Sequence, residues 1–263
     1  MSRILANYHT HTSRCKHASG TDRDYVETAV QNDFSVLGFS DHMAWPFKTG
    51  FQSPVRMDVK ELPDYAASIH ALQKEFSSNI RIHLGAECEY FPDFLPWLKE
   101  EKEKLDLEYL ILGVHCSPNE ERQLQFANAT QPEHLNDYTH LVIAGMETGM
   151  FTYLCHPDLP LKSYPVFDSH VREMSRLICE CASALHIPLE YNLAGLRLRG
   201  TVPDGYGYTS DAFWQIAAQY KCSAIIAADA HEPDVLNDTL AFENARQKLT
   251  NWGIPVIDDV LPE

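Results

Sequence analysis

The sequence predicts an α/β fold in which parallel strands and helices alternate to form a closed or nearly closed barrel. Short apolar segments alternate with longer amphipathic ones along the chain, an order typical of βα units around a parallel sheet. The first predicted strand is followed by HTHTSRCKHASG rather than by a glycine-rich phosphate loop, which disfavours the alternative, an open doubly wound sheet. No linker rich in Pro, Ser or Gly divides the 263 residues, so we expect one domain over residues 1–263.

Each predicted element follows from its pattern of apolar residues. Short apolar runs predict strands at residues 4–9, 36–40, 80–89, 109–115, 152–156, 188–192 and 224–229. Amphipathic segments between them predict helices at residues 22–32, 61–78, 93–104, 132–145, 167–186, 210–219 and 238–252. The clearest helical periodicity is that of Val171, Met174, Leu177, Ile178, Cys181 and Leu185.

The charge of the chain argues against nucleic acid and membranes as partners. Lys and Arg number 21 and Asp and Glu number 37, giving a net charge of -16, and such a surface repels phosphate backbones and anionic lipids. The N-terminus has no apolar signal segment, and no window approaches the roughly 18 to 20 apolar residues of a membrane span. The seven cysteines, an odd number without a CxxC pair, do not suit a disulfide framework. We therefore expect a cytoplasmic protein without long nucleic acid or membrane partners.

Nearly every predicted strand ends in residues that can bind metals. These strand-end residues are His9, His11, Asp41, His42, Glu87, Glu89, His115, His156, Glu190, Asn192, Asp229 and His231. The C-terminal ends of the strands form the active-site rim of parallel barrels, so seven separate segments would present ligands to one basin. Six histidines in or beside helices, or early in a strand, are assigned no function: His70, His83, His134, His140, His170 and His186.

The spacing at these strand ends suits shared metal ions. Residues i and i+2 of a strand lie on one face, so His9 with His11 and Asp229 with His231 can each hold an ion side by side. Imidazole suits zinc, iron and nickel, whereas carboxylate adds affinity for manganese and the option of a bridge between two ions. Burial of Glu87 would be costly unless its carboxylate is paired or coordinated.

Other residues near the strand ends are expected to support the site or the core. Asp41 can bind a metal or orient a histidine ring, and we favour the second role. Arg197 and Arg199 follow the sixth predicted strand in an expected loop, and their guanidinium groups match phosphate oxygens. Cys116 and Cys155 would face away from the neighbouring histidines and pack in the core. The chain has no GxSxG motif for a serine nucleophile.

Seven short segments carry a family resemblance: YHTHTSRCKHA, GFSDH, LGAECEY, GVHCS, CHPD, LEYN and AADAH. With these segments, in the family's order over nearly the whole chain, the sequence resembles the polymerase and histidinol phosphatase (PHP) superfamily, and most closely its histidinol-phosphate phosphatases. The resemblance implies a distorted (β/α)7 barrel of the TIM-barrel type, with three divalent metal ions at the C-terminal strand ends. Family members often continue with a small polar stretch after the Asn, but here Leu193-Ala194 stands before Gly195, so the resemblance leaves the substrate contacts of that loop open.

The resemblance also implies which residues hold the ions. One ion would be bound by His9, His11, Glu87 and Asp229, a second by Glu87, His115 and His156, and a third by His17, His42 and His231. Glu87 would bridge the first two ions. Zinc, iron and manganese all suit such a site, so the identity of the metal stays open.

The activity that the resemblance implies is hydrolysis of L-histidinol phosphate to L-histidinol and phosphate, in histidine biosynthesis. A metal-bound hydroxide would attack in line, since coordination lowers the pKa of water to about 7. Arg197 or Arg199 would clamp the phosphate. The partner would be a small phosphomonoester, and the sequence predicts no particular oligomeric state.

Three alternative functions stay open at this point. A metal-dependent amidohydrolase also begins with HxH, but no lysine stands at a predicted strand end to supply its usual bridging carboxylate. A PHP-type phosphoesterase for another phosphomonoester or a short nucleotide diester would use the same barrel. A non-enzymatic metal-binding or regulatory protein would leave a complete set of ligands unused.

Overall fold

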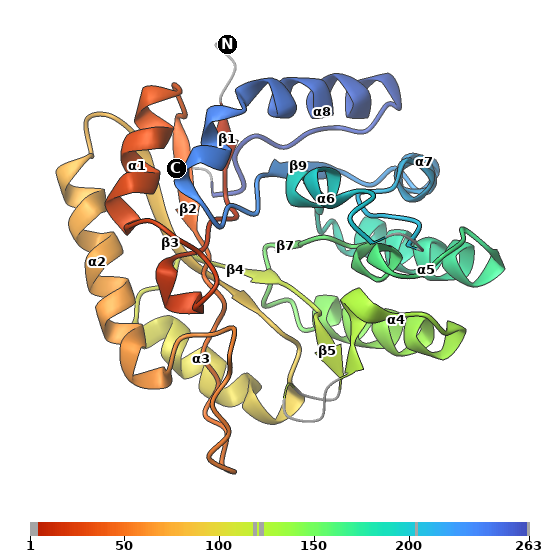
Figure 1. Ribbon diagram of the computed structural model, residues 1–263, viewed down its shortest axis with the longest axis horizontal. Helices are drawn as coiled ribbons and strands as arrows, with labels where there is room; N and C mark the ends of the chain where they lie inside the picture. The colour runs from red at the N-terminus through yellow and green to blue at the C-terminus, as the bar shows by residue number, and fades with distance from the viewer. Residues whose placement is uncertain (1–4, 118–119, 121–123, 203–204, 262–263) are drawn as a thin grey trace. The chain divides into compact units, whose positions relative to one another are not determined.

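The computed structural model describes residues 5–117, 120, 124–202 and 205–261, and its strands and helices alternate as predicted (Figure 1). The strands of the main sheet are β1 (Ala6–Asn7), β2 (Val36–Phe39), β3 (Arg81–Cys88), β4 (Tyr109–Leu112), β7 (Tyr153–Leu154), β8 (Leu189–Asn192) and β9 (Ala224–Ala227). They lie in the order β1-β2-β3-β4-β7-β8-β9, which is also their order along the chain. β5 (Cys116–Ser117) and β6 (Leu124–Gln125) form a separate antiparallel pair.

Hydrogen bonds beyond the ends of β1 and β9 join the first strand of this order to the last. Thr10 and Ala230 form a parallel bridge. The amide of His11 donates to the Ala230 carbonyl at 2.9 Å, and the Ala230 amide donates to the His9 carbonyl at 3.1 Å. An open doubly wound sheet would leave its outer strands unpaired with each other. The predicted α/β barrel of seven parallel strands is therefore confirmed.

The chain divides into two compact units. The first unit consists of Met1–Ile111, Ala227–Leu240 and Asp258–Glu263, and the second of Leu112–Ile226 and Ala241–Ile257. The expectation of a single domain over residues 1–263 stays a prediction.

In the first unit, three helices follow the strands in turn: α1 (Asp22–Gln31), α2 (Leu62–Glu75) and α3 (Leu95–Lys104) (Figure 1). α1 begins where sequence chemistry favours a helix start, because Thr21 and Asp24 form a capping box. All four residues of β2 are buried, as expected of a parallel strand that is covered on both faces.

Two glycines make room for a tyrosine in the core of the first unit. The ring of Tyr109 lies so close to Gly38 and Gly85 that a Cβ atom at either position would collide with it. The Tyr109 hydroxyl donates to the carbonyl of Tyr8 at 2.7 Å. Close approach, rather than backbone conformation, therefore requires glycine at both positions.

In the second unit, α4 (Pro132–Glu147) packs beside α5 (Ser169–Leu185) (Figure 1). The Asp168 carboxylate caps α5 by accepting from the amides of His170 and Val171 at 2.9 and 3.0 Å. The buried residues of α5 are Val171, Met174, Ser175, Ile178, Cys179 and Ala182. The predicted apolar face is confirmed in part: Val171, Met174 and Ile178 are buried, whereas Leu177 and Cys181 are half-buried and Leu185 is exposed.

Three more helices complete the chain: α6 (Leu193–Leu198), α7 (Asp211–Gln219) and α8 (Thr239–Asn251). The expectation of a loop after the sixth strand was wrong, because Asn192 starts α6 there by accepting from the amide of Gly195 at 2.8 Å. β7 is shorter than predicted because the chain turns at His156, whose φ is +31°. None of the seven cysteines, all of which lie in the described part of the chain, forms a disulfide. Among the described residues, no helix is long and apolar enough to cross a bilayer.

We expect Asn7 to stabilise the junction between the first and last strands. Its Nδ2 donates to the His9 carbonyl at 3.1 Å and to Thr10 Oγ1 at 2.8 Å, and its Oδ1 accepts from the Ala228 amide at 2.7 Å. Asn7→Ala removes these partners inside the core, so the free energy of unfolding should fall by about 1–3 kcal/mol. Urea denaturation in the presence of a chelator measures it. The exposed Asn251→Ala should cost less than about 0.5 kcal/mol, and equal losses in both variants would contradict this role.

Candidate metal centre

The strand register of the first unit brings the pair His9 and His11 close to the pair Asp229 and His231. The bridge between Thr10 and Ala230 sets His9 and His11 beside Asp229. Asp229 Oδ1 lies 3.6 Å from His9 Nε2 and 3.1 Å from His11 Nε2, and the two Nε2 atoms are 3.1 Å apart. These three side chains therefore direct ligand atoms at one point, as a metal ion requires.

Glu87 lies at the centre of this cluster. It stands near the end of β3, only 1% exposed, and its backbone pairs with that of His42 in a parallel bridge. Its Oε2 lies 2.7 Å from His42 Nδ1, 3.6 Å from His9 Nε2 and 3.7 Å from His11 Nε2. This carboxylate oxygen thus lies beside His9 and His11 of the first predicted ion and beside His42 of the third. The predicted bridge from the first ion to the second stays a prediction.

Of the third predicted set, His231 meets His17 in one group of ligand atoms and His42 in another. His231 Nε2 lies 3.0 Å from His17 Nε2, and the ligand atoms of His11, His42 and His231 converge within 4.8 Å. His17 is exposed and His231 is half-buried, so this side of the cluster is open to solvent. Cys15 lies close enough to join the group, but burial raises the pKa of its thiol to about 12, which disfavours the thiolate that would bind a metal.

Asp41 contacts His11 at the ring nitrogen opposite the one that faces Asp229. Its Oδ1 lies 3.4 Å from His11 Nδ1, the ring nitrogen that is turned away from Asp229, and it accepts from the His42 amide at 2.8 Å. The Thr12 hydroxyl and amide donate to its Oδ2. This arrangement suits an orienting role, since metal-bound histidines commonly hold a carboxylate on their second nitrogen.

The electrostatics of the cluster leave one histidine charged and others neutral. Burial is the largest influence on His11 and disfavours its charged form, but hydrogen bonds with Asp229 and Asp41 outweigh it and raise its pKa to about 9. Burial lowers the pKa of His231 to about 3 and that of His42 well below its usual range. Although burial alone would raise it, the neighbouring histidines hold the pKa of Asp229 well below its ordinary value. The neutral rings and the ionised Asp229 are the forms that bind metals.

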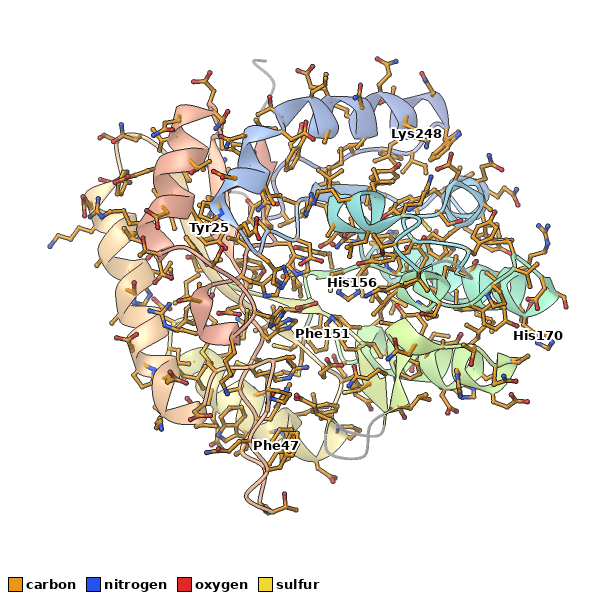
Figure 2. All side chains as sticks on the ribbon, in the orientation of Figure 1. Tyr25, Phe47, Phe151, His156, His170 and Lys248 are labelled. Atoms are coloured by element: carbon orange, nitrogen blue, oxygen red, sulfur yellow. The ribbon has the colours of Figure 1, made fainter. Side chains whose placement is uncertain are left out.

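The second unit holds the two other predicted ligands. The ring centroids of His115 and His156 are 4.8 Å apart, and the carbonyl of His156 accepts from the Tyr138 hydroxyl at 3.2 Å. His156 lies in the interior, whereas His170, to which no function was assigned, lies at the outer end of its helix (Figure 2). The expectation that Cys155 faces away from its neighbour was wrong, because its Sγ lies 3.3 Å from His156 Nε2.

Backbone strain marks two of these predicted ligands. Asp229 has a φ of +49° and His156 a φ of +31°, a region that residues other than glycine seldom occupy. The other non-glycine residues with positive φ in the described part of the chain lie at helix ends: Lys16, Asp33, Asp106, His186 and Lys221. Strain away from helix ends is typical of functional positions.

The structure places the two candidate phosphate-binding arginines on a helix and its end. Arg197 is an exposed residue of α6, and Arg199 follows that helix. The Arg199 guanidinium donates to the Thr209 carbonyl, and its Nη2 lies 3.6 Å from Asp211 Oδ1. The phosphate-binding role of both arginines stays a prediction.

Sequence reasoning missed one buried ion pair beside the cluster. Arg56 Nη2 donates to Glu89 Oε1 at 2.6 Å, and both side chains are almost fully buried. Glu89 lies two residues after Glu87, so a buried acid at a strand end was the available signal that a cation must lie nearby. Outside the cluster, His83 pairs in a similar way with Glu108 at 2.6 Å.

We expect Asp41→Asn to weaken metal binding by about 10–100-fold, because it removes the charge that orients His11. Competition with a chromophoric chelator measures the affinity. The matched control is Glu108→Gln, which alters the carboxylate–histidine pair with His83 and should leave the affinity unchanged. Equal affinities in all three proteins would rule out the orienting role.

We also expect metal loading to release a proton from His11. Its pKa of about 9 means that the ring is protonated at pH 7.5 in the metal-free protein, and a ligand must be neutral. Metal affinity should therefore fall about tenfold for each pH unit below 9 and level off above it. Calorimetry in buffers of different ionisation enthalpy counts the released protons. A count near zero at pH 7.5 would contradict the charged state of His11.

The chain is similar to known proteins over most of its length. The PHP domain family model matches residues 7–192. A Deinococcus radiodurans protein named "Probable histidinol-phosphatase" is 29% identical over 259 residues, which are 95% of this chain and 94% of that protein. The histidinol-phosphatase of Bacillus subtilis (strain 168) is 26% identical over 255 residues, which are 85% of this chain and 92% of that protein.

A solved structure has the same fold. It is the crystal structure of histidinol phosphate phosphatase from Lactococcus lactis, complexed with zinc, L-histidinol and phosphate. It superposes with a TM-score of 0.72 at 18% identity, covering 96% of this chain and 95% of that one. The family model covers well over half of the chain and includes most of the cluster in the first unit. The chain belongs to the PHP domain family.

Proposed function

We propose that this protein hydrolyses L-histidinol phosphate to L-histidinol and phosphate with three divalent metal ions. The observation that carries the proposal is the buried convergence of His9, His11, Glu87 and Asp229 in a PHP-family chain. The chain is an enzyme of the metal-dependent phosphatase class, the class of its named relatives. The names of these relatives support histidinol phosphate as the substrate of this chain, and with it a place in histidine biosynthesis in the cytoplasm.

The donor set fits the implied metals. Imidazole nitrogens with a few carboxylate oxygens suit zinc, iron and manganese, and neutral rings are already favoured at His42 and His231. We propose as ligands His9, His11, His17, His42, Glu87, His115, His156, Asp229 and His231. Ions bound there would neutralise phosphate charge and lower the pKa of a bound water to about 7.

The residues of the chain prepare the site for this chemistry. Asp41 holds the ring of His11, so that its Nε2 points into the cluster. The exposed side, at His17 and His231, admits a phosphate from solvent. Arg197 or Arg199 is proposed to bind the phosphate, because a guanidinium pairs with two phosphate oxygens at once. The net charge of -16 supports a small substrate rather than long nucleic acid.

The experiment that tests the proposal compares three substrates on the metal-loaded enzyme: L-histidinol phosphate, p-nitrophenyl phosphate and a dinucleotide diester. The highest kcat/KM is expected for L-histidinol phosphate, and chelation should abolish turnover until metal is returned. A clear preference for the diester would contradict the monoester assignment. Full activity of metal-free protein would contradict the metal centre.

We expect Glu87→Gln to lower turnover by more than the 10–100-fold that is typical when a residue around the metal ligands is changed. The reason is that the Glu87 carboxylate lies beside both His9 and His42. The metal content of this variant should fall as well, as elemental analysis can measure. Glu89→Gln is the matched control two residues away. It should keep its metal but unfold more easily, by up to about 3 kcal/mol, since buried Arg56 loses its counter-charge. Loss of metal in folded Glu89→Gln, or full turnover in Glu87→Gln, would reverse the assignment.

A further inference from the structure

We infer that Tyr65 of α2 is a positioning residue for the candidate metal centre. Its hydroxyl group takes the place of one backbone hydrogen bond between β2 and β3, and in this way it holds Asp41 beside His11. The inference rests on the proposed function, because that function supplies the metal ions. It adds a residue outside the predicted ligand set that acts through Asp41.

The parallel pairing of β2 with β3 is interrupted just before two predicted ligands. Four residue pairs join the strands from Val36 to Phe39, and His42 pairs with Glu87 further on in the same register. The two residues in between, both of which the structure describes, form no bridge to β3. The interruption therefore lies within a continuous register, rather than at a change of register.

The hydroxyl of Tyr65 occupies this interruption. A regular parallel ladder would pair the Asp41 amide directly with the Gly85 carbonyl, because its hydrogen bonds are evenly spaced. Instead, the Asp41 amide donates to the Tyr65 hydroxyl at 3.3 Å, and that hydroxyl donates to the Gly85 carbonyl at 3.0 Å. Both backbone groups thus have a partner, but an oxygen atom stands between the two strands.

The Tyr65 side chain is held in place from both sides. It belongs to the buried face of α2, which consists of Leu62, Tyr65, Ala66, Ile69 and Leu72. The guanidinium carbon of Arg14 lies over its ring, 5.7 Å from the centroid. Burial raises the pKa of Tyr65 well above its usual value, so the hydroxyl keeps the proton that it donates.

The inserted hydroxyl acts on the residue that orients His11. Asp41 Oδ1 lies 3.4 Å from His11 Nδ1, and Asp41 Oδ2 accepts from the Thr12 amide at 3.2 Å. The carboxylate therefore reaches toward residues 11 and 12, while the hydroxyl keeps the Asp41 backbone away from β3. Direct pairing with Gly85 would draw that backbone toward β3 and lengthen the contact with His11.

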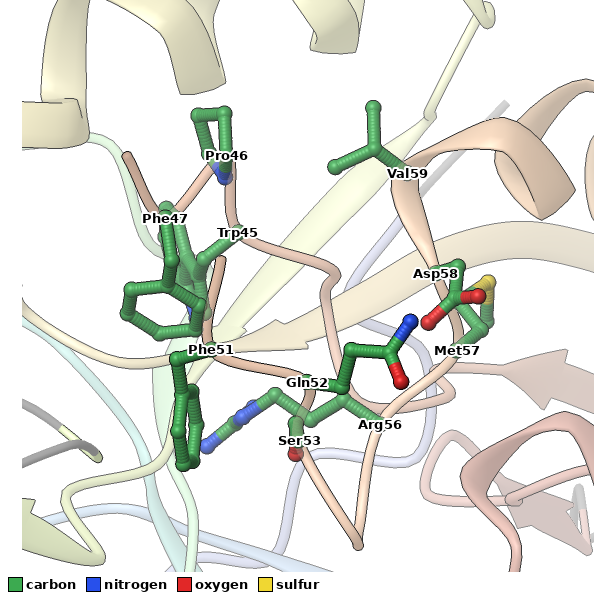
Figure 3. A pocket seen from close by; sticks show the side chains of 10 residues that line it. All are labelled: Trp45, Pro46, Phe47, Phe51, Gln52, Ser53, Arg56, Met57, Asp58 and Val59. Atoms are coloured by element: carbon green, nitrogen blue, oxygen red, sulfur yellow. The ribbon is translucent and has the colours of Figure 1, made fainter. Parts of the chain in front are cut away.

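The chain beyond Asp41 has supports of its own. The Met43 amide donates to the Glu87 carbonyl at 2.8 Å, where the ladder resumes. Further along, Trp45 packs on Phe91 with ring centroids 5.2 Å apart, in the wall of the pocket shown in Figure 3. Loss of the tyrosine hydroxyl should therefore move Asp41 and leave this loop in place.

The test removes the hydroxyl with Tyr65→Phe and measures zinc affinity by competition with a chromophoric chelator. The freed Asp41 amide and Gly85 carbonyl can pair with each other, so the melting temperature of the metal-free protein should fall by less than about 4 °C. Zinc binding should weaken about 3- to 10-fold, the change that corresponds to one hydrogen bond. The matched control is Tyr164→Phe, since Tyr164 is also buried and its hydroxyl donates to Asp168 at 2.9 Å. It should keep the zinc affinity of wild type.

A double-mutant cycle with Asp41→Asn tests whether Tyr65 acts through Asp41. In the Asp41→Asn background, Tyr65→Phe should change zinc affinity by less than about twofold, because the orienting carboxylate is already gone. An equal loss in both backgrounds would overturn the positioning role. A fall in melting temperature without a loss of affinity would also overturn it, because Tyr65 would then support only the fold.

The outcomes keep this inference separate from the proposed function. If wild-type enzyme hydrolyses L-histidinol phosphate and Tyr65→Phe binds zinc as tightly as wild type, the positioning role is overturned and the function stands. If wild-type protein binds zinc without hydrolysing this ester, the function fails, and the affinities still decide on Tyr65. If it binds neither zinc nor manganese, the metal centre fails and the positioning role fails with it. Circular dichroism melts verify that each variant is folded.

Discussion

The parallel register at the C-terminal ends of β1, β2, β3 and β9 is the constraint on which the candidate metal centre depends. Two bridges fix it, between Thr10 and Ala230 and between His42 and Glu87. Each bridge places predicted ligands, or their neighbours in the sequence, beside predicted ligands from another strand. Side chains alternate faces along an extended chain, so a slip of one residue at either bridge would turn imidazoles away from the cluster. The ladder of backbone hydrogen bonds therefore positions the ligand side chains as well as holding the sheet.

The buried acids of the first unit explain its unusual electrostatics. Glu87, Asp229 and Asp41 lie together out of water, where isolated charges are costly. In the metal-free chain the proton on His11 offsets part of that charge, which is why its pKa is raised. The same concentration of negative charge attracts divalent cations, which would take the place of that proton. The negative net charge of the whole chain is thus accompanied by a local concentration of buried carboxylates in the first unit.

Much of the fold and of the cluster could be predicted from the sequence, because apolar runs that end in His, Asp or Glu repeat at every strand. His17 was found only through the family resemblance, since it lies beyond a strand end near the short helical turn Ser13–Cys15. α6 was missed because six residues are too few for a periodic signal, and its capping residue, Asn192, already fitted the end of a strand. The pair of Arg56 and Glu89 joins positions 33 residues apart, and no local pattern records such a contact.

Two hydrogen bonds, from Met43 to Glu87 and from Lys16 to Ser53, tie the loop after β2 to the backbone beside predicted ligands. Cations bound at His17 and His42 would therefore favour one conformation of this loop. Such coupling is reciprocal: the factor by which bound cations would favour that conformation equals the factor by which the conformation would strengthen cation binding.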